Sequence, residues 1–546
     1  MTPMKMHHAH IPIPALLCSF TLVATSLSSS GQSLSLEEVV PAELFSIDGM
    51  AKASQIQQGA NYSIFVSNAN IGALGDADML ALRVNSDGSI PHALRIGDGN
   101  YHDVCKEVMQ VGKNYYLTGY TRSIDTAVSP AYTAFLIKLD TALNFLWQKN
   151  FILPGMDLYA NSITQASDGT LLVTGQLYNG LWNSFLMKTD TSGTLLWFKE
   201  YALTNRVSFS CVRELPGGDI LMSGDAAFGF QHILPAACKV NAQGDPIWGR
   251  FFNYPSSIQN SDFFFIRPVF GGDVLLAGKT NVAGAGAEDF FVTRIDTAGA
   301  VVWAKTYGGA GIDFPFMAQF DGSANELVMV GHSTSFTSSG TPYGTAMRIS
   351  PTGDLLGATL LGDTTTQQNI TLYHSCRLTS TSRFFYGSRG TPANDLYITA
   401  TDNALANLCD AYPVSAATTA FSSLTGTFTF TVSAPVPLVS DSALDFGPFA
   451  GDSLMCQHAL GVDVLNDHER GMRLWPNPGD GDFHVNAPAD MHPYVVFACD
   501  LSGRVIMQGL WKNADVELPG SLAPGTYVIH VIDRSGRSVS ALYQRR

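Results

Sequence analysis

The chain is poor in charged residues, and positive charge is the scarcer kind. Charged side chains make up 14% of its 546 residues, against about 25% in an ordinary soluble protein. The 31 lysines and arginines are outnumbered by 46 aspartates and glutamates, so the formal net charge is −15. Such a chain would be repelled by a phosphate backbone, which excludes a nucleic-acid binder. The 46% hydrophobic content and 51 glycines exclude a disordered chain and a coiled coil.

Long apolar runs are also lacking. Residues 15–27 are mostly apolar, but they are too few and too interrupted to span a bilayer. They follow a short basic region with Lys5 and precede the small residues 26–31, which is the pattern of a cleaved export signal. We therefore expect residues 1–31 to be a signal peptide and the mature protein to have no transmembrane segment.

The cysteines are scattered and the familiar catalytic patterns are missing. No C-x-x-C pair occurs among the seven cysteines after residue 31, so neither a zinc site nor a redox motif is indicated. Most are expected to be buried as small apolar residues, and Cys409 with Cys456 is the best candidate disulfide in an exported chain. The ten histidines of the mature part form no H-E-x-x-H motif, and no G-x-S-x-G motif occurs.

What the chain does contain is an internal repeat. A four-residue turn of the type Asp-x-x-Gly recurs at spacings of 50–55 residues, beginning at Asn85, Asp190, Asn241, Asp296 and Ser350, with degenerate copies that lack the glycine at Asp140 and Asp402. An apolar run ending in glycine recurs with the same period, at Gly119, Gly175, Gly224, Gly278, Gly331 and Gly387. Two independent markers with one period predict a repeated structural unit.

Each unit has the pattern of four short strands. Residues 289–296 and 300–307 alternate between apolar and polar side chains on either side of the Asp296 turn, and two further short strands complete the unit. Four strands repeated every 50 or so residues predict an all-β fold, a seven-bladed β-propeller over residues 32–409. We expect one blade to be shared, with strands around the Asp402 turn joined by strands from residues 42–67, because closure removes free sheet edges.

These repeats resemble the secreted bacterial propeller repeats in which a turn is followed by a Trp-x-Lys strand. The pattern stands at Trp147-Gln148-Lys149, Trp197-Phe198-Lys199, Trp248-Gly249-Arg250 and Trp303-Ala304-Lys305. The resemblance covers residues 42–409 and implies an architecture but no activity. One large aromatic residue in each blade is expected to fill the space between blades, rather than to form a ring that stacks on carbohydrate.

Residues 410–470 break the repeat and are rich in Ser, Thr, Ala and Pro. We expect a linker or flanking β segment there. Residues 471–546 again contain short alternating strands between glycine turns, which predicts a small C-terminal β-sandwich.

This C-terminal part resembles the type A sorting domain of the type IX secretion system. Four motifs occur in the order of that family, and the resemblance assigns sorting roles to Pro476, Asn477, Pro478, Asp500, Gly503, Arg504, Gly525 and Tyr527. The family carries folded cargo across the outer membrane of Gram-negative bacteria. The resemblance therefore implies passage through the periplasm, contact with the type IX machinery, and release or display at the cell surface.

No cofactor is predicted, and calcium is the one ion that the residues bring into question. The Asp-x-x-Gly turns offer a single carboxylate each and are expected to be turns closed by their own side chains. Asp76-x-Asp78, Glu288-Asp289 and Asn394-Asp395 are richer in carboxylates. The glycine-rich stretches 284–286 and 308–311 precede no helix, so they are expected to be tight connections rather than phosphate sites.

Two function classes remain open. The first is a secreted or surface-displayed binding or adhesion protein, whose partner is an extracellular glycan or protein. The alternative is a propeller enzyme, a polysaccharide hydrolase or lyase, with carboxylates gathered at the axis from different blades. Repetition without a catalytic motif favours the binding protein.

Overall fold

The computed structural model consists of strands and turns throughout the part of the chain that it describes. That part comprises residues 36–448, with gaps at 41–45, 51, 55–61, 71–76, 86–91, 98–100, 123–130, 228–231, 254–258, 270, 283, 322–323, 338, 362–368, 378–381, 391–394, 403–404, 406–410, 415, 421–423 and 441–445, together with seven strands between 473 and 545. The described strands fall into two compact units, one within residues 31–449 and one at the C-terminal end. Among the described residues, no helix is long and apolar enough to cross a membrane.

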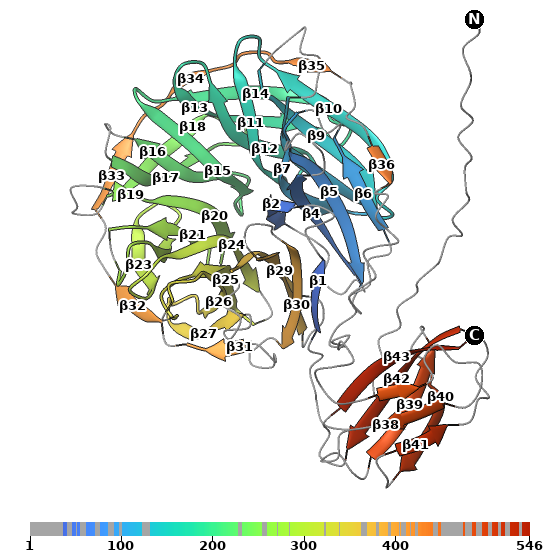
Figure 1. Cartoon of the computed structure of the whole chain (residues 1–546). Coiled ribbons are helices and arrows are strands. Elements are labelled where there is room, and N and C mark those ends of the chain that lie inside the picture. Colours follow the sequence, from blue (N-terminus) through green and yellow to red (C-terminus); the bar gives the residue numbers. More distant parts are fainter. Residues whose placement is uncertain are drawn as a thin grey trace, which may run out of the picture. The chain divides into compact units, whose positions relative to one another are not determined.

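The first unit is a β-propeller, and its third blade shows how each blade is built. Four antiparallel strands follow one another in sequence and in space: β11 (Asp157–Gln165), β12 (Leu171–Tyr178), β13 (Trp182–Thr189) and β14 (Leu195–Ala202). The first strand lies innermost and the fourth lies toward the rim (Figure 1). Both faces of the middle strands are buried, because neighbouring blades pack against each of them; β12 is buried over five consecutive residues.

Five further blades repeat this arrangement. Blade 1 is β2 (Ser46–Met50), β4 (Tyr62–Asn70), β5 (Ala77–Asn85) and β6 (His92–Ile96). Blade 2 is β7 (Asp103–Val111), β8 (Asn114–Thr121), β9 (Thr133–Asp140) and β10 (Phe145–Ile152), with β3 (Lys52–Ser54) parallel to β7. Blade 4 is β15 (Arg206–Glu214), β16 (Ile220–Ala227), β17 (His232–Val240) and β18 (Pro246–Asn253), with β19 (Gln259–Asn260) beside β17. Blade 5 is β20 (Asp262–Pro268), β21 (Val274–Thr280), β22 (Asp289–Ile295) and β23 (Val301–Gly308). Blade 6 is β24 (Asp313–Asp321), β25 (Glu326–Ser333), β26 (Tyr343–Ile349) and β27 (Leu355–Leu361).

A further sheet joins the two ends of the propeller segment, and we call it the closing sheet. It consists of β28 (Ile370–Arg377), β29 (Ser382–Arg389), β30 (Asp395–Asp402) and, as its fourth strand, β1 (Leu36–Val40). Leu36 pairs with Ala400 and Val40 with Leu396 in an antiparallel register. The sequence-based placement of the N-terminal closing strands within 42–67 is therefore wrong, because that stretch supplies the inner strands of blade 1 and the strand before it closes the sheet.

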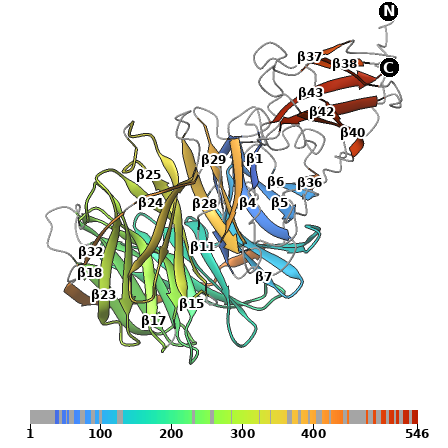
Figure 2. The ribbon, with the colours of Figure 1, turned by 90° about the horizontal axis from the view of Figure 1, so that it is seen from below.

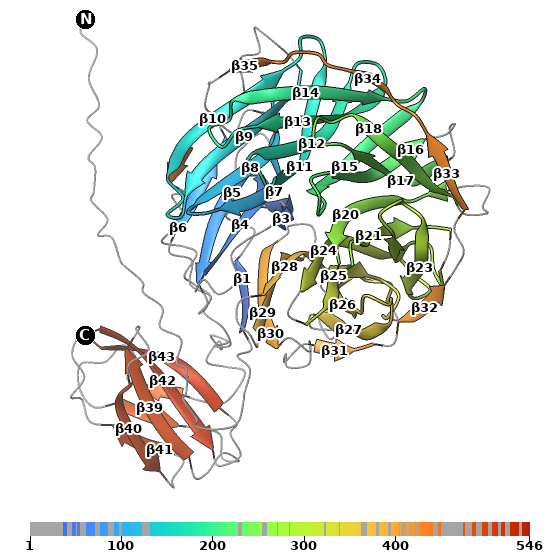
Figure 3. The same cartoon turned by 180° about the vertical axis from the view of Figure 1, so that it is seen from behind.

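A second long-range element surrounds the propeller, and we call it the belt. Its six short strands are β31 (Ala411–Pro413), β32 (Ala417–Ala420), β33 (Leu424–Phe428), β34 (Thr431–Ser433), β35 (Leu438–Ser440) and β36 (Phe446–Pro448). They pair antiparallel with the outermost strands of blades 6, 5, 4, 3, 2 and 1, in that order. The chain thus returns along the rim in the reverse direction, as the orange strands show in Figures 1 and 3, and Figure 2 shows β32 beside β23 from the side.

The belt occupies most of the stretch that the sequence predicts to be a linker or flanking β segment. Its strands are three to five residues long, and the side chains of β34 are exposed. Only residues 425–433 alternate clearly enough to predict a strand, and β33 and β34 lie there. What holds the belt is backbone pairing with edge strands that would otherwise be open.

A β-bulge in each inner strand explains the recurring glycine. The inner strand contains one extra residue that shifts the register; in blade 4 this is Ser210, between the pairs Phe209–Gly224 and Cys211–Ser223. The bulge brings a carbonyl oxygen over the second strand, and a Cβ on Gly224 would lie under 3.0 Å from the Ser208 carbonyl. The same overlap holds at the other recurring glycines, Gly119, Gly175, Gly278, Gly331 and Gly387.

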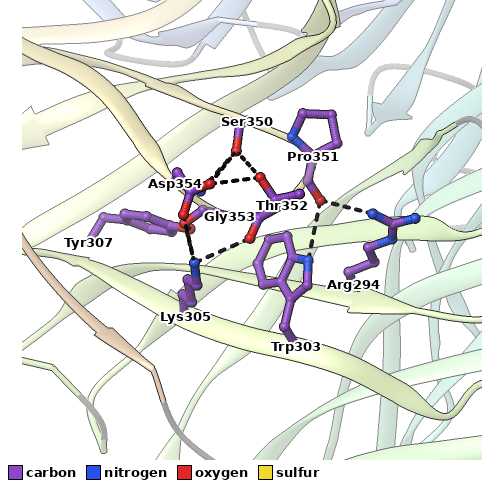
Figure 4. Close-up of polar contacts among 9 residues, drawn as sticks. All are labelled: Arg294, Trp303, Lys305, Tyr307, Ser350, Pro351, Thr352, Gly353 and Asp354. Carbon is purple, nitrogen blue, oxygen red and sulfur yellow. Dashed lines mark hydrogen bonds and ion pairs between the residues drawn. The ribbon is translucent and has the colours of Figure 1, made fainter.

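The second recurring marker, the Asp-x-x-Gly turn, locks one blade to the preceding one. In blade 6 the Ser350–Gly353 turn receives four hydrogen bonds from three residues of strand β23 of blade 5, one of them from Lys305 Nζ to the Thr352 carbonyl over 3.2 Å (Figure 4). Trp303 Nε1 donates to the Pro351 carbonyl over 3.2 Å, while Lys305 Nζ and the Tyr307 hydroxyl each donate to the Gly353 carbonyl over 2.8 Å. The half-buried tryptophan therefore packs between blades, as the sequence predicts.

The C-terminal unit contains two antiparallel sheets. One has the order β37 (Arg473–Trp475), β38 (Phe483–Asn486) and β41 (Asp515–Leu518). The other has the order β40 (Val505–Trp511), β39 (Tyr494–Asp500), β42 (Gly525–Asp533) and β43 (Ser538–Arg545). Tyr527 and Ile529 on β42 are buried.

The bulge geometry generates a prediction for the substitution Gly224→Ala. The new methyl group would overlap a backbone carbonyl that cannot rotate away, so we expect a loss of about 1–3 kcal/mol in the free energy of unfolding. Gly357→Ala is the matched control, since no atom lies within 4 Å of its Cβ position on β27. Chemical denaturation of both variants gives the comparison, and equal stability would contradict the bulge explanation.

Candidate functional site

The antiparallel order of the blades gives the propeller two different ends. Turns between first and second strands and between third and fourth strands lie at one end, which we call the turn face. Loops between second and third strands, and connections from one blade to the next, lie at the other end, which we call the connection face.

The turn face is built from self-contained turns. Asp190 Oδ1 accepts hydrogen bonds from the backbone N–H groups of Ser192 (2.8 Å) and Thr194 (2.9 Å), and Asp296 Oδ1 does the same for Ala298 and Ala300. Gly193 and Gly299 take positive φ angles of 82° and 81°. The aspartates are thereby occupied by their own backbone, as predicted, and the turns have a structural role.

Buried charge lies on the inner strands instead. Glu107 of blade 2 forms an ion pair with Arg213 of blade 4, with 2.8 Å between the charged atoms. It also accepts a 2.9 Å hydrogen bond from the backbone amide of Ile163 in blade 3. Arg267 of blade 5 lies close enough to this pair that burial and the positive charge of Arg213 lower its pKa. Three blades therefore meet at one carboxylate, and a fourth places a cation near it.

A second buried pair joins blade 6 to the closing sheet. Arg383 of β29 contacts Asp321 of β24 over 3.0 Å, and both side chains are at most 2% exposed. The axial carboxylates Glu107 and Asp321 are thus neutralised by arginines. Each of these ion pairs links side chains of two different sheets, so both contribute to the packing between them.

The connection face carries a cluster of aromatic side chains from blades 2 and 3, which we call the aromatic cluster. Ring centroids are 4.8 Å apart for Tyr120 and Tyr159, 5.1 Å for Tyr132 and Tyr159, and 5.6 Å for Tyr159 and Trp182. Tyr178 extends the cluster at 4.9 Å from Trp182 and is 39% exposed.

Two cations flank the aromatic cluster. Lys106 Nζ and the Arg122 guanidinium each lie 5.5 Å from a ring centroid, those of Tyr120 and Tyr132 respectively. Lys106 is the bulge residue of β7, so the bulge turns a cation toward the aromatic cluster. Half-buried aromatic faces with flanking charge can stack on apolar faces of a ligand while the cations bind its polar groups.

The aromatic cluster was missed by the sequence analysis, and the reason is its position. Its members stand at the ends of second and third strands and on one inner strand, where the two recurring markers give no information. The Glu107–Arg213 pair was missed because its members are 106 residues apart. Only the tertiary arrangement of blades brings either group together.

Only some of the sorting-domain residues and cysteines that the sequence analysis names lie in the part of the chain that the structure describes. Asp500 and Tyr527 are cross-strand partners on β39 and β42, and Gly525 begins β42. Pro476, Asn477, Pro478, Gly503 and Arg504 lie outside the described residues, as do Cys409, Cys456 and the expected signal peptide. Cys105, Cys211 and Cys238 are free and buried. Among the residues the structure describes, no three His, Cys, Asp or Glu side chains converge as a metal site.

Comparisons with known proteins add little. No family model and no curated protein matches this chain. Among solved structures it is similar to PorZ, a bacterial surface component of the type IX secretion system of Porphyromonas gingivalis, at 11% identity over 92% of this chain and 75% of that one, with a TM-score of 0.26. It is also similar to a Dyadobacter fermentans protein of unknown function, at 11% identity over 67% and 98% of the two chains, with a TM-score of 0.38. Likenesses this low carry no argument about activity or partners.

The axial ion pair generates a prediction for Glu107→Gln. The substitution keeps the shape but leaves Arg213 and Arg267 without their carboxylate, so we expect a loss of about 3–5 kcal/mol in the free energy of unfolding. Glu214→Gln is the control, because Glu214 makes only a peripheral hydrogen bond to the Ser167 amide and should cost about 1 kcal/mol or less. Denaturant titration of both variants measures the difference; equal losses would show that the axial carboxylate is not a shared anchor.

Proposed function

We propose that this chain is an exported binding protein that presents the connection face of a seven-bladed propeller to an extracellular glycan. The seventh blade is the closing sheet, in which β28, β29 and β30 follow one another from inside to outside as in the other blades, while β1 forms the outermost strand. The net charge of −15 favours a partner that is neutral or basic. A protein ligand is the other outcome to be tested.

The observation that carries the proposal is the aromatic cluster. Sugar rings expose apolar C–H faces that stack on tyrosine and tryptophan, while their hydroxyl groups take hydrogen bonds from neighbouring polar groups. Tyr159 and Trp182 present half-buried rings, and Tyr178 is exposed beside them. The repeated tryptophans of the turn face, by contrast, are occupied in packing between blades.

The alternative of a polysaccharide hydrolase or lyase receives no specific support. Such an enzyme needs an accessible acid together with a base or nucleophile. Three carboxylates of the inner strands are withdrawn from solvent, since Glu107 and Asp321 are paired with arginines and Asp313 is fully buried. A substrate has no access to these three groups. Asp157, Glu214 and Asp262 are half-buried and lie on separate blades.

For export we propose that residues 1–31 are the signal peptide and residues 471–546 a small β-sandwich that acts as a type IX sorting domain. The support is the order of the four sequence motifs in this region. Asp500 and Tyr527, which belong to different motifs, face each other across a strand pair, so the motifs that lie far apart in sequence belong to one local structure. The mature protein would then be secreted or displayed on the outer membrane.

The proposed binding surface generates a prediction for Tyr178→Ala and Trp182→Ala. On an array of neutral and charged bacterial glycans, wild-type protein should bind at least one glycan. Each substitution should weaken that binding about two- to twelvefold, because stacking on one aromatic ring contributes about 0.5–1.5 kcal/mol. Tyr101→Ala is the control, since Tyr101 is equally exposed at 38% but lies outside the aromatic cluster. Binding that survives both cluster substitutions, or turnover of a polysaccharide, would refute the assignment.

The sorting assignment generates a separate prediction. In a Gram-negative host with a type IX system, deletion of residues 473–546 should leave a folded propeller in the periplasm, because the export signal would be lost while the propeller strands remain. Fusing residues 471–546 to an unrelated periplasmic protein is the reciprocal control and should carry it to the surface or the medium. Fractionation and immunoblotting give the result, and surface delivery of the truncated protein would contradict the assignment.

A further inference from the structure

Two junctions between blades contain a pair of buried aspartates around a glycine. Asp78 and Asp103 meet at Gly97, between blades 1 and 2, and Asp289 and Asp313 meet at Gly308, between blades 5 and 6. At either glycine a Cβ would lie under 3.0 Å from oxygens of both carboxylates. All four aspartates are at most 1% exposed.

The two junctions are structurally equivalent. In blade 1, Asp78 precedes Met79, whose partner Ile96 precedes Gly97; in blade 5, Asp289 precedes Phe290, whose partner Tyr307 precedes Gly308. The second aspartate begins the inner strand of the next blade in both cases. The same register places Arg95 opposite Leu80 in the first junction and Thr306 opposite Phe291 in the second.

That single difference changes the charge balance. Arg95 contacts Asp78 Oδ2 through Nη2 at 2.6 Å and through Nε at 2.8 Å, so the first pair has a counter-charge. The second pair has Thr306 in that place. The neighbouring Lys279 pairs with Glu288 at 2.7 Å, and burial lowers the pKa of His332, which keeps that imidazole neutral near pH 7.

The second pair also has hydrogen-bonding capacity left over. Asp313 Oδ2 accepts from the Gly309 amide (2.8 Å) and the Ser335 hydroxyl (2.6 Å), and Asp289 Oδ2 accepts from the Gly286 amide (3.3 Å). The Oδ1 atoms of Asp289 and Asp313 are both buried and have no hydrogen-bond partner. Two buried acceptor atoms on neighbouring carboxylates leave an uncompensated negative site.

We propose that a calcium ion occupies the junction between blades 5 and 6, bound by Asp289 and Asp313, and takes the place that Arg95 fills in the equivalent junction. Calcium accepts carboxylate, backbone carbonyl and water oxygens in irregular geometries, and this donor set contains oxygen alone. Two carboxylates supply two negative charges, which match a divalent ion. Water would supply the remaining ligands.

The site explains the glycine-rich stretches 284–286 and 308–311 without a phosphate. Both lie beside the aspartate pair: Gly286 donates to Asp289, and Gly309 donates to Asp313. Burial and the charge of Asp313 raise the pKa of Asp289 to about 6, so the ionised form of Asp289 is disfavoured at this site. A bound cation would stabilise that ionised form. The ion would thus connect the third strand of blade 5 to the inner strand of blade 6.

Calorimetric titration of CaCl2 into the EDTA-treated full chain tests the proposal, together with thermal unfolding in calcium and in EDTA. We expect a saturable site and a midpoint that rises by several degrees in calcium, because an ion that binds only the folded state stabilises it. Asp289→Asn and Asp313→Asn should abolish both effects. Asp78→Asn is the matched control: its junction has Arg95, so the calcium-induced rise should persist whatever its starting stability.

A fourth variant replaces the proposed calcium ion by the positive charge of a side chain. Thr306→Arg places a guanidinium where the other junction has Arg95, so its midpoint should be the same in calcium and in EDTA. Wild-type protein that binds no calcium and unfolds identically in calcium and EDTA would overturn the proposal without reference to any variant. Stabilisation on acidification to pH 5 in place of calcium binding would show that the aspartates share a proton instead.

Discussion

The constraint on which this architecture depends is the open backbone edge. A four-stranded blade ends in a rim strand whose N–H and C=O groups have no partner within the blade, and exposed edges of that kind invite pairing with other chains. Here the belt covers the rim strands of six blades, and β1 completes the closing sheet from the other end of the chain. Two segments that lie far along the chain from their partners therefore supply the outermost strands of these sheets.

Inside the ring, buried charged side chains need partners, just as the backbone groups of the rim strands do. Inner strands bring carboxylates into the interior of the ring, where they meet guanidinium groups of other sheets and where isolated charge is expensive. Glu107 meets Arg213, and Asp321 meets Arg383, so packing between blades there requires specific partners and not only apolar bulk. The junction aspartates follow the same logic, with Arg95 as the partner in one place and Thr306 standing at the same register position in the other.

The sequence predicted the propeller because its two markers are local. The Asp190 turn closes on its own backbone, and Gly224 faces a carbonyl on the adjacent strand of the same hairpin, so each leaves a mark at a fixed spacing. The belt left no recurring mark, since its strands are short and are held by backbone pairing with residues far away in the sequence. Phe446 of β36, for example, pairs with Ile96 of β6. The aromatic cluster and the Glu107–Arg213 pair were equally hidden, because blade packing rather than sequence proximity assembles them.

The belt also determines how the propeller yields to a pull. Tension that enters from the C-terminal end of the belt loads β36 first, then β35, and reaches β31 last, because the strands follow one another around the rim. Each is held by only three to five residue pairs. Force would therefore detach the belt one blade at a time and lengthen the tether in steps, while the four-stranded blades and the closing sheet stay folded.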